Sequence, residues 1–215
     1  MIPMMVKLRK ETHKQLAQAQ DVITEELYNS FQDAVLHGGT AIWRCYQGNR
    51  FSEDIDAYVT KDQKLVEKFF ERLKIRGFEI KKKKIGENSI YSKLQLGRTE
   101  VRFEAIFAKK SGSLKDYEKA DGNYMTVYTL TAEELIKEKV AAYLQRRKIR
   151  DLYDIFFLLR HAINAGEIIQ ALKNLIKDYE TPLDEKDLKV LILEGLVPTS
   201  EKMLEYIQIW AKKNT

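Results

Sequence analysis

Residues 37–56 read HGGTAIWRCYQGNRFSEDID, and this stretch contains the pattern on which the fold depends. Its last part predicts a strand over 52–60, because apolar residues there alternate with polar or aromatic ones. On a strand, side chains at positions i and i+2 lie on one face. Asp54 and Asp56 would therefore point the same way while Ile55 points into the core.

Two carboxylates held side by side repel each other unless a cation offsets the repulsion. Magnesium prefers oxygen ligands, and a carboxylate pair can hold one or two ions that also bind the phosphates of a nucleotide. An isolated Asp-x-Asp is more often ordinary strand polarity or part of a turn. The interpretation of Asp54 and Asp56 as a metal site therefore depends on the surrounding residues.

The residues upstream strengthen this interpretation. Apolar spacing predicts a long helix over about 12–36 and a second, short helix over 40–46, with the glycine pair between them. Amide N–H groups at the start of a helix are free to bind phosphate oxygens, and glycine lets the backbone approach closely. The alternative is that the glycines only end the first helix. The predicted nucleotide-binding residues here are Gly38, Gly39, Thr40 with its hydroxyl, Arg50 and Ser52.

A third carboxylate is expected on a neighbouring strand. After a helix that Asp62 caps, the pattern predicts strands over 78–85, 89–96 and 99–107, a loop over 109–122 and a strand over 124–130. Glu104 lies in the middle of the third of these strands among apolar residues, which is an unusual place for an unpaired charge. Glu104 is therefore the predicted third metal ligand, with Glu100 as the fallback. The alternative is an exposed face of an amphipathic strand.

The character of the sequence changes at residue 131. Residues 131–134, Thr-Ala-Glu-Glu, form a capping box that opens a helix, and the remaining chain has helical spacing. We predict a domain over 1–130 and a helical domain over 131–215. The fold class is α+β: a mixed β-sheet flanked by helices, followed by an all-helical C-terminal part.

Basic residues recur in the helical part. On one continuous helix, Lys139, Arg146 and Arg150 would share a face, and this row could neutralise a triphosphate. Asp151 could orient one of these cations or contact the sugar of the nucleotide. The alternative is a solvated helix face with ion pairs.

Composition limits the function classes. The net charge of +5 and a pI near 9.0 favour anionic partners such as nucleotides or RNA. The run of four lysines over 81–84 fits either RNA binding or a solvated strand edge that is protected from aggregation. No apolar run approaches the roughly 20 residues of a membrane span, which excludes a membrane partner. Cys45 is the only cysteine, so an internal disulfide is excluded, and the three histidines lack ligand spacing, so we do not expect a zinc site. We expect a cytoplasmic protein.

Two blocks of the sequence resemble the AbiEii/AbiGii abortive-infection nucleotidyltransferase toxins. The first block contains His37-Gly38-Gly39-Thr40-Ala41-Ile42, Arg50 and Ser52-Glu53-Asp54-Ile55-Asp56. The second contains Glu134-Leu135-Ile136, Glu138-Lys139, Ala142, Arg147 and Arg150-Asp151-Leu152-Tyr153-Asp154. The blocks follow each other in the family's order from about residue 25 to residue 160.

The resemblance implies a polymerase-β-like nucleotidyltransferase core and transfer of a nucleoside monophosphate from a nucleoside triphosphate, with release of pyrophosphate. It implies that Gly39, Thr40 and Ser52 hold the triphosphate and that Asp54 and Asp56 hold two magnesium ions. It also implies that Lys139, together with Arg147 and Arg150, contacts the phosphates and that Asp151 supports the catalytic centre.

Some members of the family act on tRNA acceptor ends and are countered by an antitoxin, so an RNA acceptor and an antitoxin protein are the expected partners. Two alternatives remain open. One is a non-catalytic protein of the same fold that binds nucleotides or nucleic acid. The other is an enzyme that modifies a protein or a small molecule.

Overall fold

The structure is a computed structural model that describes residues 4–215. Their contacts form two compact units. The sheet unit comprises the chain up to Gln47 together with Ser52–Thr129. The helical unit comprises Gly48–Phe51 and Leu130–Thr215. The four residues 48–51 therefore leave the sheet unit between two of its elements and pack with the helical unit.

The sheet unit is built on a mixed sheet of seven strands in the order β3-β4-β5-β2-β1-β7-β6. The pairs β2–β5 and β1–β7 are parallel, and the other neighbours are antiparallel. The strands are β1 (Val35–His37), β2 (Asp54–Val59), β3 (Glu79–Ile85), β4 (Ser89–Leu96), β5 (Thr99–Phe107), β6 (Ser113–Glu118) and β7 (Tyr124–Thr129). Its helices are α1 (Met4–Lys7), α2 (Glu11–Ser30), α3 (Gly38–Cys45) and α4 (Gln63–Ile75). This confirms the predicted α+β class.

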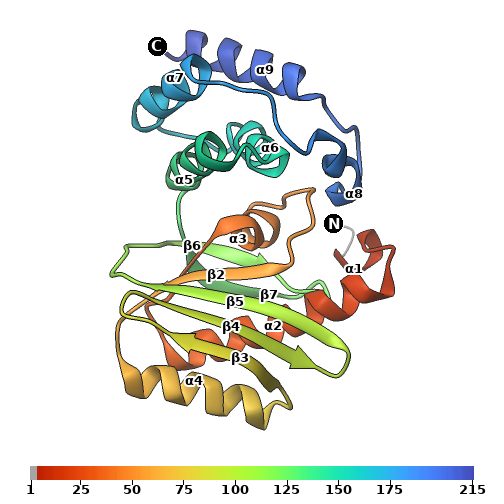
Figure 1. The fold of residues 1–215 in the computed structure, drawn as a ribbon, viewed down its shortest axis with the longest axis vertical. Coiled ribbons are helices and arrows are strands. Elements are labelled where there is room, and N and C mark those ends of the chain that lie inside the picture. The colour runs from red at the N-terminus through yellow and green to blue at the C-terminus, as the bar shows by residue number, and fades with distance from the viewer. Residues whose placement is uncertain (1–3) are drawn as a thin grey trace. The chain divides into compact units, whose positions relative to one another are not determined.

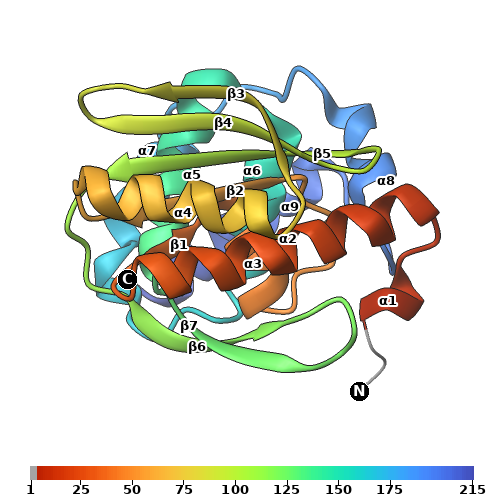
Figure 2. The ribbon, with the colours of Figure 1, turned by 90° about the horizontal axis from the view of Figure 1, so that it is seen from below.

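The long helices α2 and α4 cover one face of the sheet (Figures 1 and 2). Alternating apolar residues of β2, β4 and β5 pack there in one core with both helices, and Ile55 and Phe103 are fully buried in it. Burying apolar side chains in this way is the main favourable term in folding. The opposite face of these three strands is polar, and we call it the carboxylate face because Asp54, Asp56 and Glu104 lie on it.

Local patterns predicted several elements correctly. The Asp62 side chain accepts hydrogen bonds from the amides of Lys64 and Leu65 and caps α4, and Thr131 and Glu134 form the predicted capping box. The predicted strands match β2, β3, β4, β5 and β7, and the run of four lysines lies on β3, at the edge of the sheet.

Two predicted boundaries were wrong. The first long helix ends at Ser30, not near residue 36, and residues 35–37 form β1 between β2 and β7. The predicted loop over 109–122 contains β6, which pairs with β7 along its length. Strand β1 depends on pairing with distant segments, which an apolar stripe does not reveal, whereas β6 pairs with the next strand along the chain and was missed because its composition is polar.

The helical unit begins with α5 (Ala132–Arg146), which packs against α6 (Ile149–Leu158). It continues through α7 (Ile169–Lys177), α8 (Leu188–Leu191) and α9 (Ser200–Lys213), with short 3₁₀ turns before α7 and α8. The chain of residues 49–51 hydrogen-bonds to residues 191–193, so this segment is part of the unit. Within residues 4–215, no helix is both long and apolar enough to cross a membrane.

Candidate active site

The two aspartates predicted from the sequence lie on the carboxylate face of β2. Residues along β2 alternate between half-buried and buried, so Asp54 and Asp56 point away from the core while Ile55 points into it. This follows from the two-residue repeat of a strand. The aspartates are neighbours on one face, as the spacing predicted.

The glycine turn lies directly against one of these carboxylates. In the antiparallel pair β1–β2, His37 is opposite Asp56, and the next residue, Gly38, has a φ of +71°. A Cβ added at Gly38 would lie 2.9 Å from Cγ of Asp56 and closer still to its Oδ2. Only glycine meets both the backbone angle and the close approach. The main chain at the start of α3 therefore borders the Asp56 carboxylate.

Thr40 has a different contact from the one predicted for its hydroxyl. The hydroxyl donates a hydrogen bond to the backbone oxygen of Asp54, and only 1% of the residue is exposed. The single hydrogen of this hydroxyl is therefore used within the chain, and its predicted contact with phosphate stays a prediction. The bond instead joins the first turn of α3 to the start of β2. Ser52, which is also buried, accepts a hydrogen bond from Gln20 Nε2 at its backbone oxygen.

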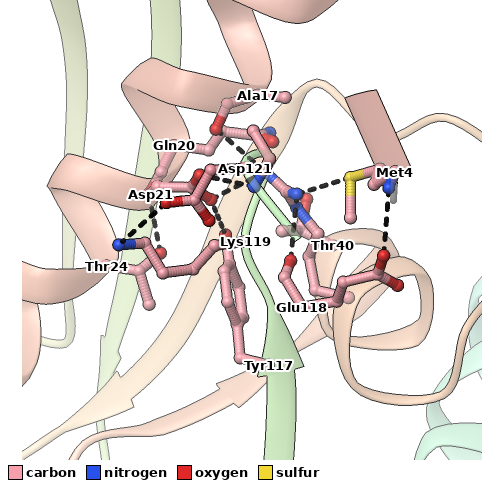
Figure 3. Close-up of polar contacts among 12 residues, drawn as sticks. Met4, Ala17, Gln20, Asp21, Thr24, Thr40, Tyr117, Glu118, Lys119 and Asp121 are labelled. Carbon is pink, nitrogen blue, oxygen red and sulfur yellow. Dashed lines mark hydrogen bonds and ion pairs between the residues drawn. The ribbon is translucent and has the colours of Figure 1, made fainter. Parts of the chain in front are cut away.

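A buried arginine fixes the other end of α3. The Arg44 guanidinium is fully buried and donates to Asp21 Oδ1 at 3.0 Å, to the Ala17 oxygen at 2.8 Å and to the Glu118 oxygen at 3.1 Å. Figure 3 shows Asp21 and Glu118 approaching this cluster from α2 and β6. Sequence reasoning missed the Arg44 cluster, because its members come from three distant segments. It stabilises the helix on which the glycine turn depends.

Strand β5 brings a third carboxylate and an arginine to the same face. The parallel register of β2 and β5 places Asp54 opposite Arg102 and Asp56 opposite Glu104. The Arg102 guanidinium forms an ion pair with Asp54 and another with Glu104, whose Oε1 lies 3.3 Å from Nε. Glu104 thus shares a face with both aspartates. The fallback residue, Glu100, pairs with Lys93 at 2.8 Å.

The pKa of Glu104 is raised, and burial is the largest cause. The negative charges of Asp56 and Asp54 also raise this pKa, while Arg102 lowers it. On this part of the carboxylate face, the carboxylates of Asp54, Asp56 and Glu104 outnumber the guanidinium of Arg102. A further cation would therefore be stabilised there.

The donor set of the carboxylate face suits magnesium, which prefers carboxylate oxygens. A divalent ion would also offset the negative charges of Asp54 and Asp56, which add to the effect of burial on the pKa of Glu104. The three carboxylates are not, however, gathered around one point: the described residues contain no group of three or more His, Cys, Asp or Glu arranged to hold an ion. One of the three carboxylates, Asp54, is instead paired with the Arg102 guanidinium.

A buried ion-pair network contains two of the residues predicted in the helical unit, Lys139 and Asp151. Lys139 on α5 lies 2.8 Å from Asp154 and 3.5 Å from Asp151, both on α6. Arg50 binds Asp154 through two hydrogen bonds of 2.8 Å, and Arg146 binds Asp151 in the same way. Asp151 and Asp154 are 0% and 1% exposed, so these cations must offset the cost of burying the two negative charges. Burial opposes ionisation of Asp154, but Arg50 and Lys139 outweigh it and lower the pKa of this carboxyl.

The predicted continuous cationic helix face is wrong. Arg147 adopts a left-handed conformation with φ of +52° and ends α5, so Arg150 belongs to a separate helix. Arg147 donates to the Thr181 oxygen and pairs with Glu180. Arg150 instead lines a cavity of about 450 Å³ together with Lys148 and Asp184. The roles predicted for Lys139, Asp151, Arg147 and Arg150 in catalysis or phosphate binding stay predictions.

Comparison with known proteins identifies a family. A family model described as nucleotidyl transferase AbiEii toxin of a type IV toxin–antitoxin system matches residues 24–205. No match is found among curated proteins.

Two solved structures share the fold. JHP933 from Helicobacter pylori is 21% identical with a TM-score of 0.66, and the match covers 95% of this chain and 92% of that one. MenT4, a nucleotidyltransferase toxin from Mycobacterium tuberculosis, is 19% identical with a TM-score of 0.63, over 93% of this chain and 87% of that one.

Proposed function

Because this chain belongs to the AbiEii family of nucleotidyltransferase toxins, we propose that it transfers a nucleoside monophosphate to the 3′ end of an RNA with the help of magnesium. The family itself implies a nucleotide substrate and an antitoxin partner. The observation that carries the proposal is the contact between Gly38 and Asp56: a glycine turn at a helix start borders a carboxylate pair. Amides of a glycine turn at a helix start bind phosphates, and a carboxylate pair binds a divalent cation.

The geometry supports a division of tasks among the residues of the sheet unit. The amides at the start of α3 would hold the phosphates, and Asp54 and Asp56 would hold the metal, with Glu104 completing the ligand set once Arg102 releases Asp54. The bound magnesium would neutralise phosphate charge and make the acceptor hydroxyl more acidic. The protein contributes mainly position and charge.

The reaction forms a bond between the acceptor oxygen and the α-phosphorus and breaks the bond from that phosphorus to the bridging oxygen of pyrophosphate. Pyrophosphate leaves with the electron pair of the broken bond. The hydroxyl proton passes to solvent water.

The test is incubation of the full chain with each labelled nucleoside triphosphate, magnesium and total RNA, followed by separation of the RNA on a denaturing gel. We expect labelled RNA that disappears with a metal chelator. Asp56→Ala should lower transfer by ~10²-fold or more. Its matched control is Asp116→Ala, which removes an exposed strand aspartate from β6 and should leave transfer unchanged.

Two outcomes would reject the proposal. One is transfer by Asp56→Ala at the rate of the unaltered chain. The other is label in protein with none in RNA, which would assign a protein acceptor. A nucleotide-binding protein without activity would give no labelled product, and triphosphate would then raise its melting temperature to the same extent with and without magnesium.

A further inference from the structure

The order of the strands separates the two sides of the carboxylate pair. Strand β2 lies between β1, which leads into the glycine turn, and β5. If the phosphates bind at the glycine turn, as the proposed function requires, the leaving pyrophosphate lies on the β1 side of Asp56. An in-line displacement brings the attacking oxygen from the side opposite the leaving group. The acceptor must therefore approach across β5, β4 and β3.

A cavity lies on that side, next to Asp54. It has a volume of about 220 Å³, and Asp54, Arg102, Tyr91 and Lys93 are among the residues that line it. This is smaller than the roughly 300–1,000 Å³ of most pockets that enclose a small ligand. The cavity suits one unit of a longer molecule, the remainder of which lies on the open strands.

The strands beyond the cavity present cations beside an aromatic ring. In the register of β3 and β4, Lys82 is opposite Lys93 and Lys84 is opposite Tyr91, so all four lie on the carboxylate face. Lys82 and Lys84 are exposed, and Lys82 Nζ lies 5.2 Å from the centre of the Tyr91 ring. Cations that follow a backbone next to a ring on which a base can stack are typical of single-stranded nucleic-acid sites.

We propose that Lys82, Lys84, Tyr91 and Lys93 form the acceptor subsite of this protein and bind the single-stranded 3′ end of an RNA. Lys82 and Lys84 contact phosphates, Tyr91 stacks on a base, and the cavity beside Asp54, which Lys93 lines, receives the terminal nucleotide. A cavity of about 220 Å³ calls for a single unpaired nucleotide and not for a base pair. The proposal rests on the proposed function, from which it takes the direction of approach.

The next residue along the strand provides a matched control. Lys83 points to the other face of β3, where its Nζ lies 4.9 Å from the centre of the Phe70 ring of α4. It carries the same charge as Lys82, lies on the same strand and is also exposed. Replacing Lys82 or Lys83 by glutamate changes the net charge equally. A difference in RNA affinity between the two variants is therefore due to the face of β3 on which the side chain lies.

The experiment measures the affinity of the full chain for a fluorescently labelled single-stranded RNA by anisotropy, without triphosphate or metal. Lys82→Glu should weaken binding by about tenfold and reduce the slope of log affinity against log salt by roughly 0.7 or more, the share of one phosphate contact. Lys83→Glu should change the affinity by less than about twofold. Tyr91→Leu should weaken binding by roughly fivefold or more through lost stacking. Thermal melting of each variant checks that the fold is retained.

Equal losses of affinity in Lys82→Glu and Lys83→Glu, or no loss in either, would overturn the acceptor subsite. Since the assay contains no triphosphate, its result is separate from catalysis. If no acceptor is ever labelled and yet the two glutamate variants differ, the proposed function fails and the RNA-binding face stands. If RNA is labelled and the two variants bind alike, the function stands and this face is not the acceptor subsite.

Discussion

Replacing Gly38 by alanine should disable the candidate site while leaving the fold in place. The backbone at Gly38 has a φ of +71°, which costs an L-residue about 1–2 kcal/mol. The added methyl group would also lie 2.9 Å from Cγ of Asp56 and closer to its Oδ2, where ordinary contacts begin near 3.4 Å. The Asp56 carboxylate must therefore move by about 1 Å, a displacement that can cost roughly a hundredfold in rate.

Gly97→Ala is the matched control for this substitution. Gly97 lies in the turn between β4 and β5 with a φ of +59°, but a Cβ there would meet no atom within 4 Å. Both variants should lose about 1–2 kcal/mol, which lowers the melting temperature by roughly 2–8 °C in a chain of this size. Only Gly38→Ala should lose transfer activity.

The assays are thermal melting and the rate of labelled nucleotide transfer under saturating triphosphate. The reasoning is refuted if Gly38→Ala melts like Gly97→Ala and transfers nucleotide at the same rate. That result would mean that the turn and the carboxylate can separate without consequence, so the contact between them would not define the site.

Three further substitutions test the charged clusters. Arg44→Met leaves the buried Asp21 carboxylate without its cation, so it should lower the free energy of unfolding by about 3–5 kcal/mol. Urea titrations measure this loss, and making Asp21 apolar as well should restore part of it. The pKa of Asp154 is lowered in the folded chain, so its ion pairs stabilise the fold fully above the pKa of the unfolded chain, about 3.9, and this stabilisation is lost as the pH falls through the lower folded pKa. Between pH 5 and pH 2, Asp154→Asn should therefore lose less free energy of unfolding than the unaltered chain. An equal loss would contradict the pairing with Arg50. Arg102→Gln removes a cation that competes for Asp54, so it should bind Mn²⁺ about 2- to 5-fold more tightly than the unaltered chain. A titration followed by electron paramagnetic resonance measures this affinity. Weaker binding would show that Arg102 assists the metal.

Elements with a local cause were the ones that the sequence predicted well. The alternation along β2 follows from burial of one strand face, and the caps at Asp62 and Thr131 follow from hydrogen bonds within four residues. Asp54 and Asp56 lie on a common face for the same reason, because strand periodicity alone determines it.

Elements with a distant cause were missed. Strand β1 has only three residues, and its backbone is satisfied by β2 and β7, which lie about 20 and 90 residues further along the chain. The break between α5 and α6 occurs at Arg147, a non-glycine residue with positive φ. Arginine has no preference for that conformation, so the tertiary contacts of Arg147 with Glu180 and Thr181 maintain it.

The register of β2 against β5 explains the part of the site that no local pattern contained. A shift of one residue would turn Arg102 and Glu104 into the core and bring apolar residues onto the carboxylate face. The observed register places a cation opposite Asp54 and an anion opposite Asp56, so the two aspartates, which are equivalent in sequence, differ in surroundings. Asp54 is paired with Arg102 next to the cavity on the β4 side, and Asp56 borders the glycine turn on the β1 side. That difference makes the two sides of the carboxylate pair unequal, which is what the proposed division into a phosphate side and an acceptor side requires and what two aspartates on a strand do not have by themselves.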